Sequence, residues 1–121
     1  MNFVRRVLLW GVLLSPSYCF AYSCDTLPSS IDDSSKWLKR AANETDFDSA
    51  KNYMRKAKNS LEEASYGARD CGCDYAASEF DGASTKARRA RGASDVDDFN
   101  YQFSRAVKSY KAALDALSLC R

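Results

Sequence analysis

The chain of 121 residues contains no histidine. Histidine is the commonest general base in enzymes, the commonest ligand of zinc and copper, and the usual axial ligand of haem, so none of these sites has its usual residue here. The sequence also lacks a glycine-rich phosphate loop, and its serines have no base to activate them as nucleophiles. We therefore expect a protein that is not an enzyme and needs no cofactor.

The N-terminal apolar run, residues 7–14, is too short to span a bilayer. It follows the basic pair Arg5 and Arg6 and precedes Pro16 and a polar stretch. This order of basic, apolar and polar segments is typical of a secretory signal peptide, whereas an ordinary buried helix does not need the bracketing arginines and proline. The sequence thus predicts export to the periplasm or to the external medium, and we favour a bacterial periplasm.

Cleavage is expected after Ala21, with the bond after Ser23 as the alternative. This places a signal peptide at residues 1–21 and a single helical domain at residues 22–121. A third interpretation is a lipoprotein acylated at Cys24, and only this one gives the protein a membrane partner.

Charge argues against a nucleic-acid partner. Removal of residues 1–21 takes away two arginines and no acids, which leaves 16 basic and 16 acidic residues and a formal net charge of zero. Nucleic-acid binding depends on a clear basic excess or a basic face.

An even number of cysteines remains after cleavage, namely Cys24, Cys71, Cys73 and Cys120. In a small exported chain this indicates a disulfide framework. A bond between Cys71 and Cys73 is disfavoured because a ring closed across one residue is strained. Two patterns remain open: Cys24–Cys71 with Cys73–Cys120, or Cys24–Cys73 with Cys71–Cys120. The alternative use of the four sulfur atoms is a site for a soft metal such as Cu(I) or Zn(II).

The short turn formed by Cys71, Gly72 and Cys73 separates two amphipathic segments. Apolar and small residues recur at alternating spacings of three and four on both sides of it, which predicts two helices. Gly72 stands where the end of a helix favours a residue that tolerates left-handed dihedral angles. The sequence therefore predicts a helical hairpin with one cysteine from each helix at the turn.

Four helices are expected in total. Three begin at Ser or Thr followed three residues later by Asp, a capping-box spacing, at Ser30, Thr45 and Ser94; the remaining one covers residues 74–91. Trp37 lies beside the apolar stripe of the first helix and is expected to pack at the edge of the bundle. The apolar stripe of the last helix is the clearest and comprises Val96, Phe99, Phe103, Ala106, Tyr110, Ala113, Leu117 and Cys120.

Alanine recurs every seven residues in three of these helices, at positions 50, 57 and 64, at 76, 83 and 90, and at 106 and 113. Small residues at a seam let helix axes approach closely, and a seven-residue repeat is typical of coiled-coil packing. We expect an all-α fold, an antiparallel up-down-up-down four-helix bundle. This topology brings all four cysteines to one end, so the disulfides would gather there.

Two groups of residues are candidates for a partner surface. Four tyrosines lie off the predicted stripes, and tyrosine is common at binding surfaces. Four cations stand near the end of the third helix, although acids follow at once at positions 95, 97 and 98, and cations also favour a helix C-terminus without any partner. The candidates are Tyr53, Tyr66, Tyr75, Tyr101, Lys86, Arg88, Arg89 and Arg91.

These observations favour a small exported helical protein that acts by protein–protein contact, as a binding, adaptor or inhibitor module. Its partner is an unknown protein, or a second copy in a homodimer formed through an alanine-rich face. The two alternatives are a thiol-based binder of copper or zinc at the cysteine end and an envelope protein anchored by a lipid on Cys24.

Overall fold

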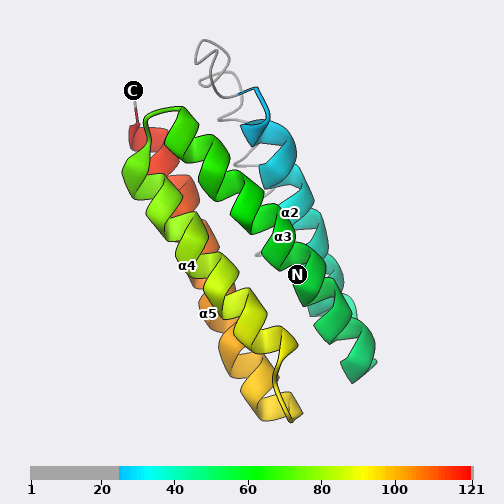
Figure 1. Ribbon diagram of the computed structural model, residues 1–121. Helices are drawn as coiled ribbons and strands as arrows, with labels where there is room; N and C mark the ends of the chain where they lie inside the picture. Colours follow the sequence, from blue (N-terminus) through cyan, green and yellow to red (C-terminus); the bar gives the residue numbers. More distant parts are fainter. Residues whose placement is uncertain (1–24, 121) are drawn as a thin grey trace.

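The computed structural model describes residues 25–120 and contains four helices there, with no strand. They are α2 (Leu27–Asn43), α3 (Phe47–Asp70), α4 (Asp74–Arg91) and α5 (Val96–Leu119). The helices pack against one another along their lengths (Figure 1). Over residues 25–120 the prediction of an all-helical fold with four helices is confirmed, whereas the predicted signal peptide and Cys24 lie outside the described residues.

Each helix runs close beside the next one in the sequence, so that α3 lies between α2 and α4, and α4 between α3 and α5. The first and last helices do not approach each other as closely along their backbones. They are joined instead by a buried side chain, because the Tyr110 hydroxyl of α5 donates a hydrogen bond to the Ile31 carbonyl of α2 at 3.3 Å.

The predicted turn between α3 and α4 is confirmed at Gly72, which has a φ of +82°. The Gly72 amide donates to the Arg69 carbonyl and the Cys73 amide to the Ala68 carbonyl, both at 2.9 Å. These two bonds form a Schellman motif, which satisfies carbonyl groups that the last turn of a helix leaves open. The left-handed dihedral at Gly72 explains why a residue without a Cβ stands there.

The prediction that the first helix begins at Ser30 is wrong, since α2 begins at Leu27. Pro28 occupies the first turn, where its fixed φ suits a helix. Amide groups in the first turn make no hydrogen bond within the helix, so the missing amide hydrogen of proline costs nothing there. Ser30 is therefore inside the helix, where its hydroxyl donates to the Thr26 carbonyl at 3.1 Å.

The other two predicted caps are each displaced by one residue. Asp46 rather than Thr45 caps α3, because its carboxylate accepts a hydrogen bond from the Ser49 amide at 2.9 Å. This bond lowers the pKa of Asp46 below its usual value. Asp95 rather than Ser94 caps α5 by accepting from the amide of Asp98 at 2.8 Å.

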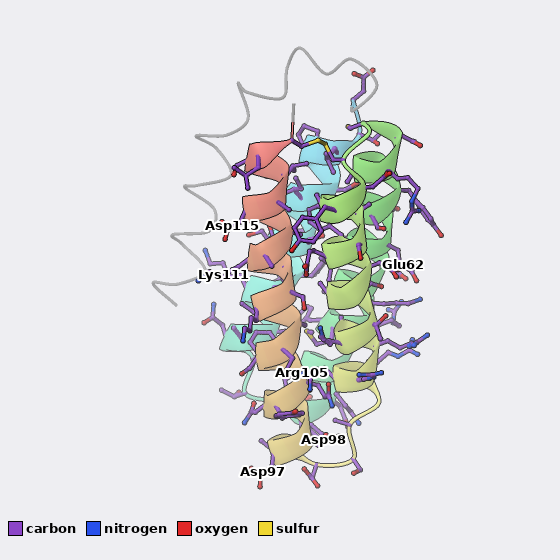
Figure 2. The ribbon with its side chains drawn as sticks, turned by 90° about the vertical axis from the view of Figure 1, so that its left-hand side faces the viewer. Glu62, Asp97, Asp98, Arg105, Lys111 and Asp115 are labelled. Carbon is purple, nitrogen blue, oxygen red and sulfur yellow. A yellow bond between two sulfur atoms is a disulfide. The ribbon has the colours of Figure 1, made fainter. Side chains whose placement is uncertain are left out.

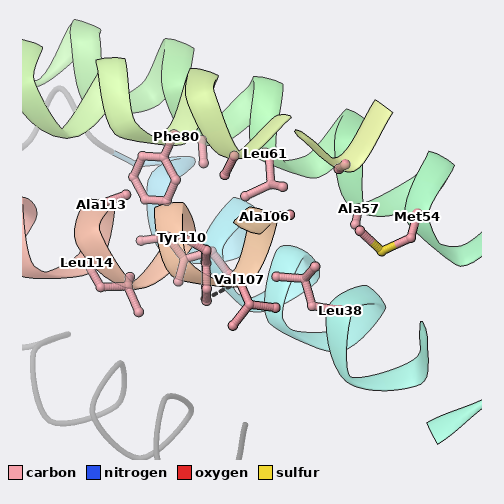
Figure 3. Close-up of a cluster of buried hydrophobic side chains, with 14 of the residues drawn as sticks. Leu38, Met54, Ala57, Leu61, Phe80, Ala106, Val107, Tyr110, Ala113 and Leu114 are labelled. Carbon is pink, nitrogen blue, oxygen red and sulfur yellow. Dashed lines mark hydrogen bonds between the residues drawn. The ribbon is translucent and has the colours of Figure 1, made fainter. Parts of the chain in front are cut away.

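The alanine seams are buried as predicted, with exposed fractions between 0 and 4%. The larger buried side chains fill the spaces beside them, as Figure 3 shows for Leu61 and Met54 of α3, Phe80 of α4 and Tyr110 of α5. Phe80 and Tyr110 pack with ring centroids 6.3 Å apart. Val96 was predicted to belong to the apolar stripe, but its side chain is 54% exposed because it stands at the free first turn of α5.

Small polar side chains share this core. Seven serines are buried, and several bond to main-chain carbonyl groups. Ser65 of α3 donates to the Ala77 carbonyl at 2.9 Å, and Ser84 of α4 donates to the Lys58 carbonyl at 3.3 Å. These two bonds run in opposite directions across the seam between α3 and α4, so they fix the register of the two helices. The seven are Ser30, Ser34, Ser35, Ser60, Ser65, Ser84 and Ser109.

Candidate contact surfaces

A disulfide joins the start of α4 to the end of α5. Cys73 and Cys120 have Cα atoms 5.8 Å apart and are separated by 47 residues in the sequence. Cys71 is also disulfide-bonded. The Cys73–Cys120 bond excludes the predicted alternative that pairs Cys73 with Cys24 and Cys71 with Cys120. The Cys24–Cys71 bond stays a prediction, because Cys24 lies outside the described residues.

Three large apolar side chains are exposed at the end of the bundle that carries this disulfide. Tyr66 stands in the last turns of α3 and is 63% exposed, and Tyr75 stands in the first turn of α4 and is 72% exposed. Leu119, the last residue of α5, is 80% exposed. We call these three residues the turn-end group. The two tyrosines are among the candidates predicted from the sequence, but Leu119 is not, although it lies off the apolar stripe and next to Cys120.

The third exposed tyrosine lies at the other end of the molecule. Tyr101 is 56% exposed in the second turn of α5, and its hydroxyl accepts a hydrogen bond from Nη1 of Arg105 at 2.7 Å. The first turn of α5 is near the first turn of α3, since the rings of Phe47 and Phe99 pack edge to face with centroids 5.9 Å apart. In Figure 2, Asp98 and Arg105 lie toward this end, away from the yellow disulfide bond. The four candidate tyrosines therefore do not form one surface.

The candidate cations of α4 also separate. The Lys86 ammonium turns toward α5 and donates to the Ser109 hydroxyl at 2.8 Å, so this lysine contributes to packing between the helices. Arg88, Arg89 and Arg91 are exposed in the last turns of α4, where cations interact favourably with the negative end of the helix dipole. Exposed aspartates follow at positions 95, 97 and 98.

Tyr53, the fourth tyrosine, belongs to a different cluster. It is half-buried, and its ring stacks on that of Trp37 with centroids 6.0 Å apart and an angle of 21° between the planes. Three cations surround the tryptophan: the nitrogen atoms of Lys36 and Lys56 lie 4.6 Å from its ring centroid, and the guanidinium carbon of Arg40 lies 5.2 Å away. We call these five residues the Trp37 cluster. It spans α2 and α3 and was not predicted from the sequence.

No helix within residues 25–120 combines the length and the apolar character that crossing a bilayer requires. Among the same residues, no three potential metal-ligating side chains come together. No protein-family model, curated protein or solved structure matches the chain.

Proposed function

We propose that this protein is a small exported, non-enzymatic helical module that acts by contact with another protein through the turn-end group. The observation that supports this best is the exposure of Tyr66, Tyr75 and Leu119, each above 60%, beside a disulfide. The three residues stand at the same end of the bundle, and tyrosine is enriched at the centres of interfaces.

The covalent and hydrogen-bonded surroundings of the turn-end group favour binding. The Schellman motif holds the turn between Tyr66 and Tyr75, and the Cys73–Cys120 bond holds the end of α5 against the start of α4. A surface that is rigid before binding loses less conformational entropy when its partner arrives. A disulfide-fixed helix end is thus a suitable platform for a partner protein.

An antiparallel up-down-up-down topology is part of this proposal. Three contacts support it: the turn of residues 71–73 joins α3 to α4, the disulfide joins the start of α4 to the end of α5, and Phe47 packs on Phe99 at the starts of α3 and α5. In this topology the predicted Cys24–Cys71 bond lies at the same end as Cys73–Cys120. Export is also part of the proposal, because disulfide bonds persist in an oxidising compartment.

Site-specific photocrosslinking in the exporting host tests the contact. A benzophenone amino acid is placed at position 66, 75 or, as the matched exposed-tyrosine control, 101. We expect positions 66 and 75 to give one discrete protein adduct that position 101 does not give. The additional substitution Leu119→Ser should weaken the adduct from position 75 by about tenfold, the effect expected for an apolar interface anchor.

The outcomes separate the possible partners. An adduct of twice the chain mass identifies a homodimer through the turn end, whereas a heavier or lighter adduct identifies a different partner. Equal labelling from positions 66, 75 and 101, or none from any of them, contradicts the proposal. Intact mass before and after reduction and alkylation tests the export and the disulfides: a chain that begins at Tyr22 or Cys24 and has no alkylatable thiol until reduced is expected.

A further inference from the structure

The Trp37 cluster holds three positive charges around one aromatic ring. A cation over the face of tryptophan is a favourable contact, and one such contact is ordinary. Here Lys36 and Arg40 come from α2 and Lys56 comes from α3, so the packing of the two helices brings the three charges together. The ring attracts them, but their mutual repulsion remains.

Within residues 25–120, no carboxylate forms an ion pair with these cations. The ion pairs within residues 25–120 are Lys51 with Asp48 and Lys58 with Glu62, and neither involves the cluster. The carboxylate of Glu44 stands near by but accepts hydrogen bonds from the backbone amides of residues 45 and 46. A surface hollow beside the cluster contains a further cation, Lys39, and two carboxylates, so that cations remain in excess around the ring. The residues that line it are Asp32, Lys36, Lys39, Arg40, Asn43, Glu44 and Tyr53.

We propose that the Trp37 cluster is a binding site for an acidic glycan, a sugar chain that carries sulfate, phosphate or carboxylate groups. The anionic groups would neutralise Lys36, Arg40 and Lys56 through charge-assisted hydrogen bonds, which are stronger than neutral ones. The partly exposed rings of Trp37 and Tyr53 supply the apolar contact that the nonpolar face of a sugar ring requires.

Two other polyanions fit this surface less well. Binding to a bilayer surface combines charge with the insertion of apolar side chains. The large apolar residues that are exposed within residues 25–120 are Tyr66, Tyr75, Val96, Tyr101 and Leu119, and none belongs to the cluster. A nucleic acid requires a more extensive basic surface than three cations in a chain whose mature form is neutral. A peptide made of aspartate and glutamate would use the charges but has no ring to lie on the aromatic pair.

Isothermal titration calorimetry, which measures the affinity of the exported protein for a heparin-derived octasaccharide, tests the site. The cluster variant K36Q/R40Q/K56Q and the control variant R88Q/R89Q/R91Q each remove three exposed or partly exposed cations, so they lose equal charge. At an ionic strength of about 0.1 M, we expect the cluster variant to bind at least about tenfold more weakly and the control to change by less than about twofold. Circular dichroism confirms that both variants remain helical.

A second variant separates the ring from the charges. Trp37→Phe keeps all three cations and a smaller aromatic ring, and we expect it to weaken octasaccharide binding by about threefold to tenfold. Trp37 is the only tryptophan after residue 21, so the tryptophan fluorescence of the unsubstituted exported protein should change on titration and report on the cluster directly. The glycan-binding measurements involve residues of α2 and α3 only. Their outcome is therefore independent of whether the turn-end group binds a partner protein.

Three results would overturn the proposal. The first is an equal loss of affinity in the cluster and control variants, which would show attraction by charge alone. The second is equal binding of uncharged dextran. The third is binding of phosphatidylserine vesicles or polyglutamate at least as tight as that of the octasaccharide, which would assign the site to a lipid surface or to an acidic peptide.

Discussion

Removal of the disulfide between Cys73 and Cys120 should destabilise the protein by about 4 kcal/mol. The bond closes a loop of 47 residues. In the chain-entropy account, a cross-link of this span removes on the order of 14 cal/mol/K from the unfolded ensemble, which is about 4 kcal/mol at 25 °C. For a domain of this size, the same loss lowers the melting temperature by roughly 20 °C.

The test uses the double variant Cys73→Ser/Cys120→Ser, because a single substitution would leave a reactive thiol. Urea unfolding followed by far-ultraviolet circular dichroism gives the free energy of unfolding and its denaturant dependence, the m-value. We expect a larger m-value in the double variant, since its unfolded chain is less constrained and exposes more surface. Leu119→Ser, at the exposed neighbour of Cys120, is the control and should change stability by less than about 0.5 kcal/mol.

A stability loss below about 1 kcal/mol with an unchanged m-value would refute this reasoning, because the unfolded chain would then gain little freedom when the bond is removed. A loss much above the calculated value would show that the bond also holds packing at the turn end. Crosslinking from position 75 in the same double variant distinguishes these cases, because loosened packing would also weaken the partner contact.

Two further predictions concern the core. Burial raises the pKa of the Tyr110 hydroxyl, which in the folded protein donates to the Ile31 carbonyl; the folded state therefore binds this proton more tightly than the unfolded state. This stabilisation is complete below about pH 10 and is lost as the pH rises further, so unfolding measured from pH 8 upward should show a steep loss that is shallower in Tyr110→Phe. The same variant should lose about 1 kcal/mol at neutral pH, and stability curves of unchanged slope would contradict the assignment. Phe80→Ala, which empties a fully buried site against Tyr110, should cost about 3–5 kcal/mol in urea unfolding; a cost no larger than that of Phe80→Leu would show that the core collapses around the gap.

The sequence predicted well those features that depend on residues close together in the chain. The alanine repeat and Gly72 defined the seams and the turn, and the bounds of α4 agree with the structure. The helix starts were less accurate because several adjacent residues can cap. Asp46 competes with Thr45, and Asp95 with Ser94; the carboxylate has the preferred geometry in both cases. At α2 the proline at position 28 determined the start instead.

The candidate surfaces were harder to predict. An off-stripe position indicates that a tyrosine is near the surface, but it does not reveal which end of the bundle it occupies or what it touches. The Trp37 cluster depends on Lys56 of α3 meeting Trp37 of α2, a contact that no spacing within one helix encodes. The available signal was the position of Lys36 and Arg40, which flank Trp37 within one turn; the prediction from the sequence was only that Trp37 packs at the edge of the bundle.

The uneven joining of the four helices has a consequence for local motion. The segment from α3 to α5 is held by close alanine seams, by serine bonds across one of them and by a disulfide. The backbone of α2 runs close to that of α3, whereas α2 meets α5 through side chains in the shared core and the hydrogen bond of Tyr110. Separation of α2 therefore breaks fewer contacts than separation of any inner helix, and its amide hydrogens should exchange with solvent through openings smaller than global unfolding. Because the Trp37 cluster straddles α2 and α3, a ligand bound there would clamp this seam and slow that exchange.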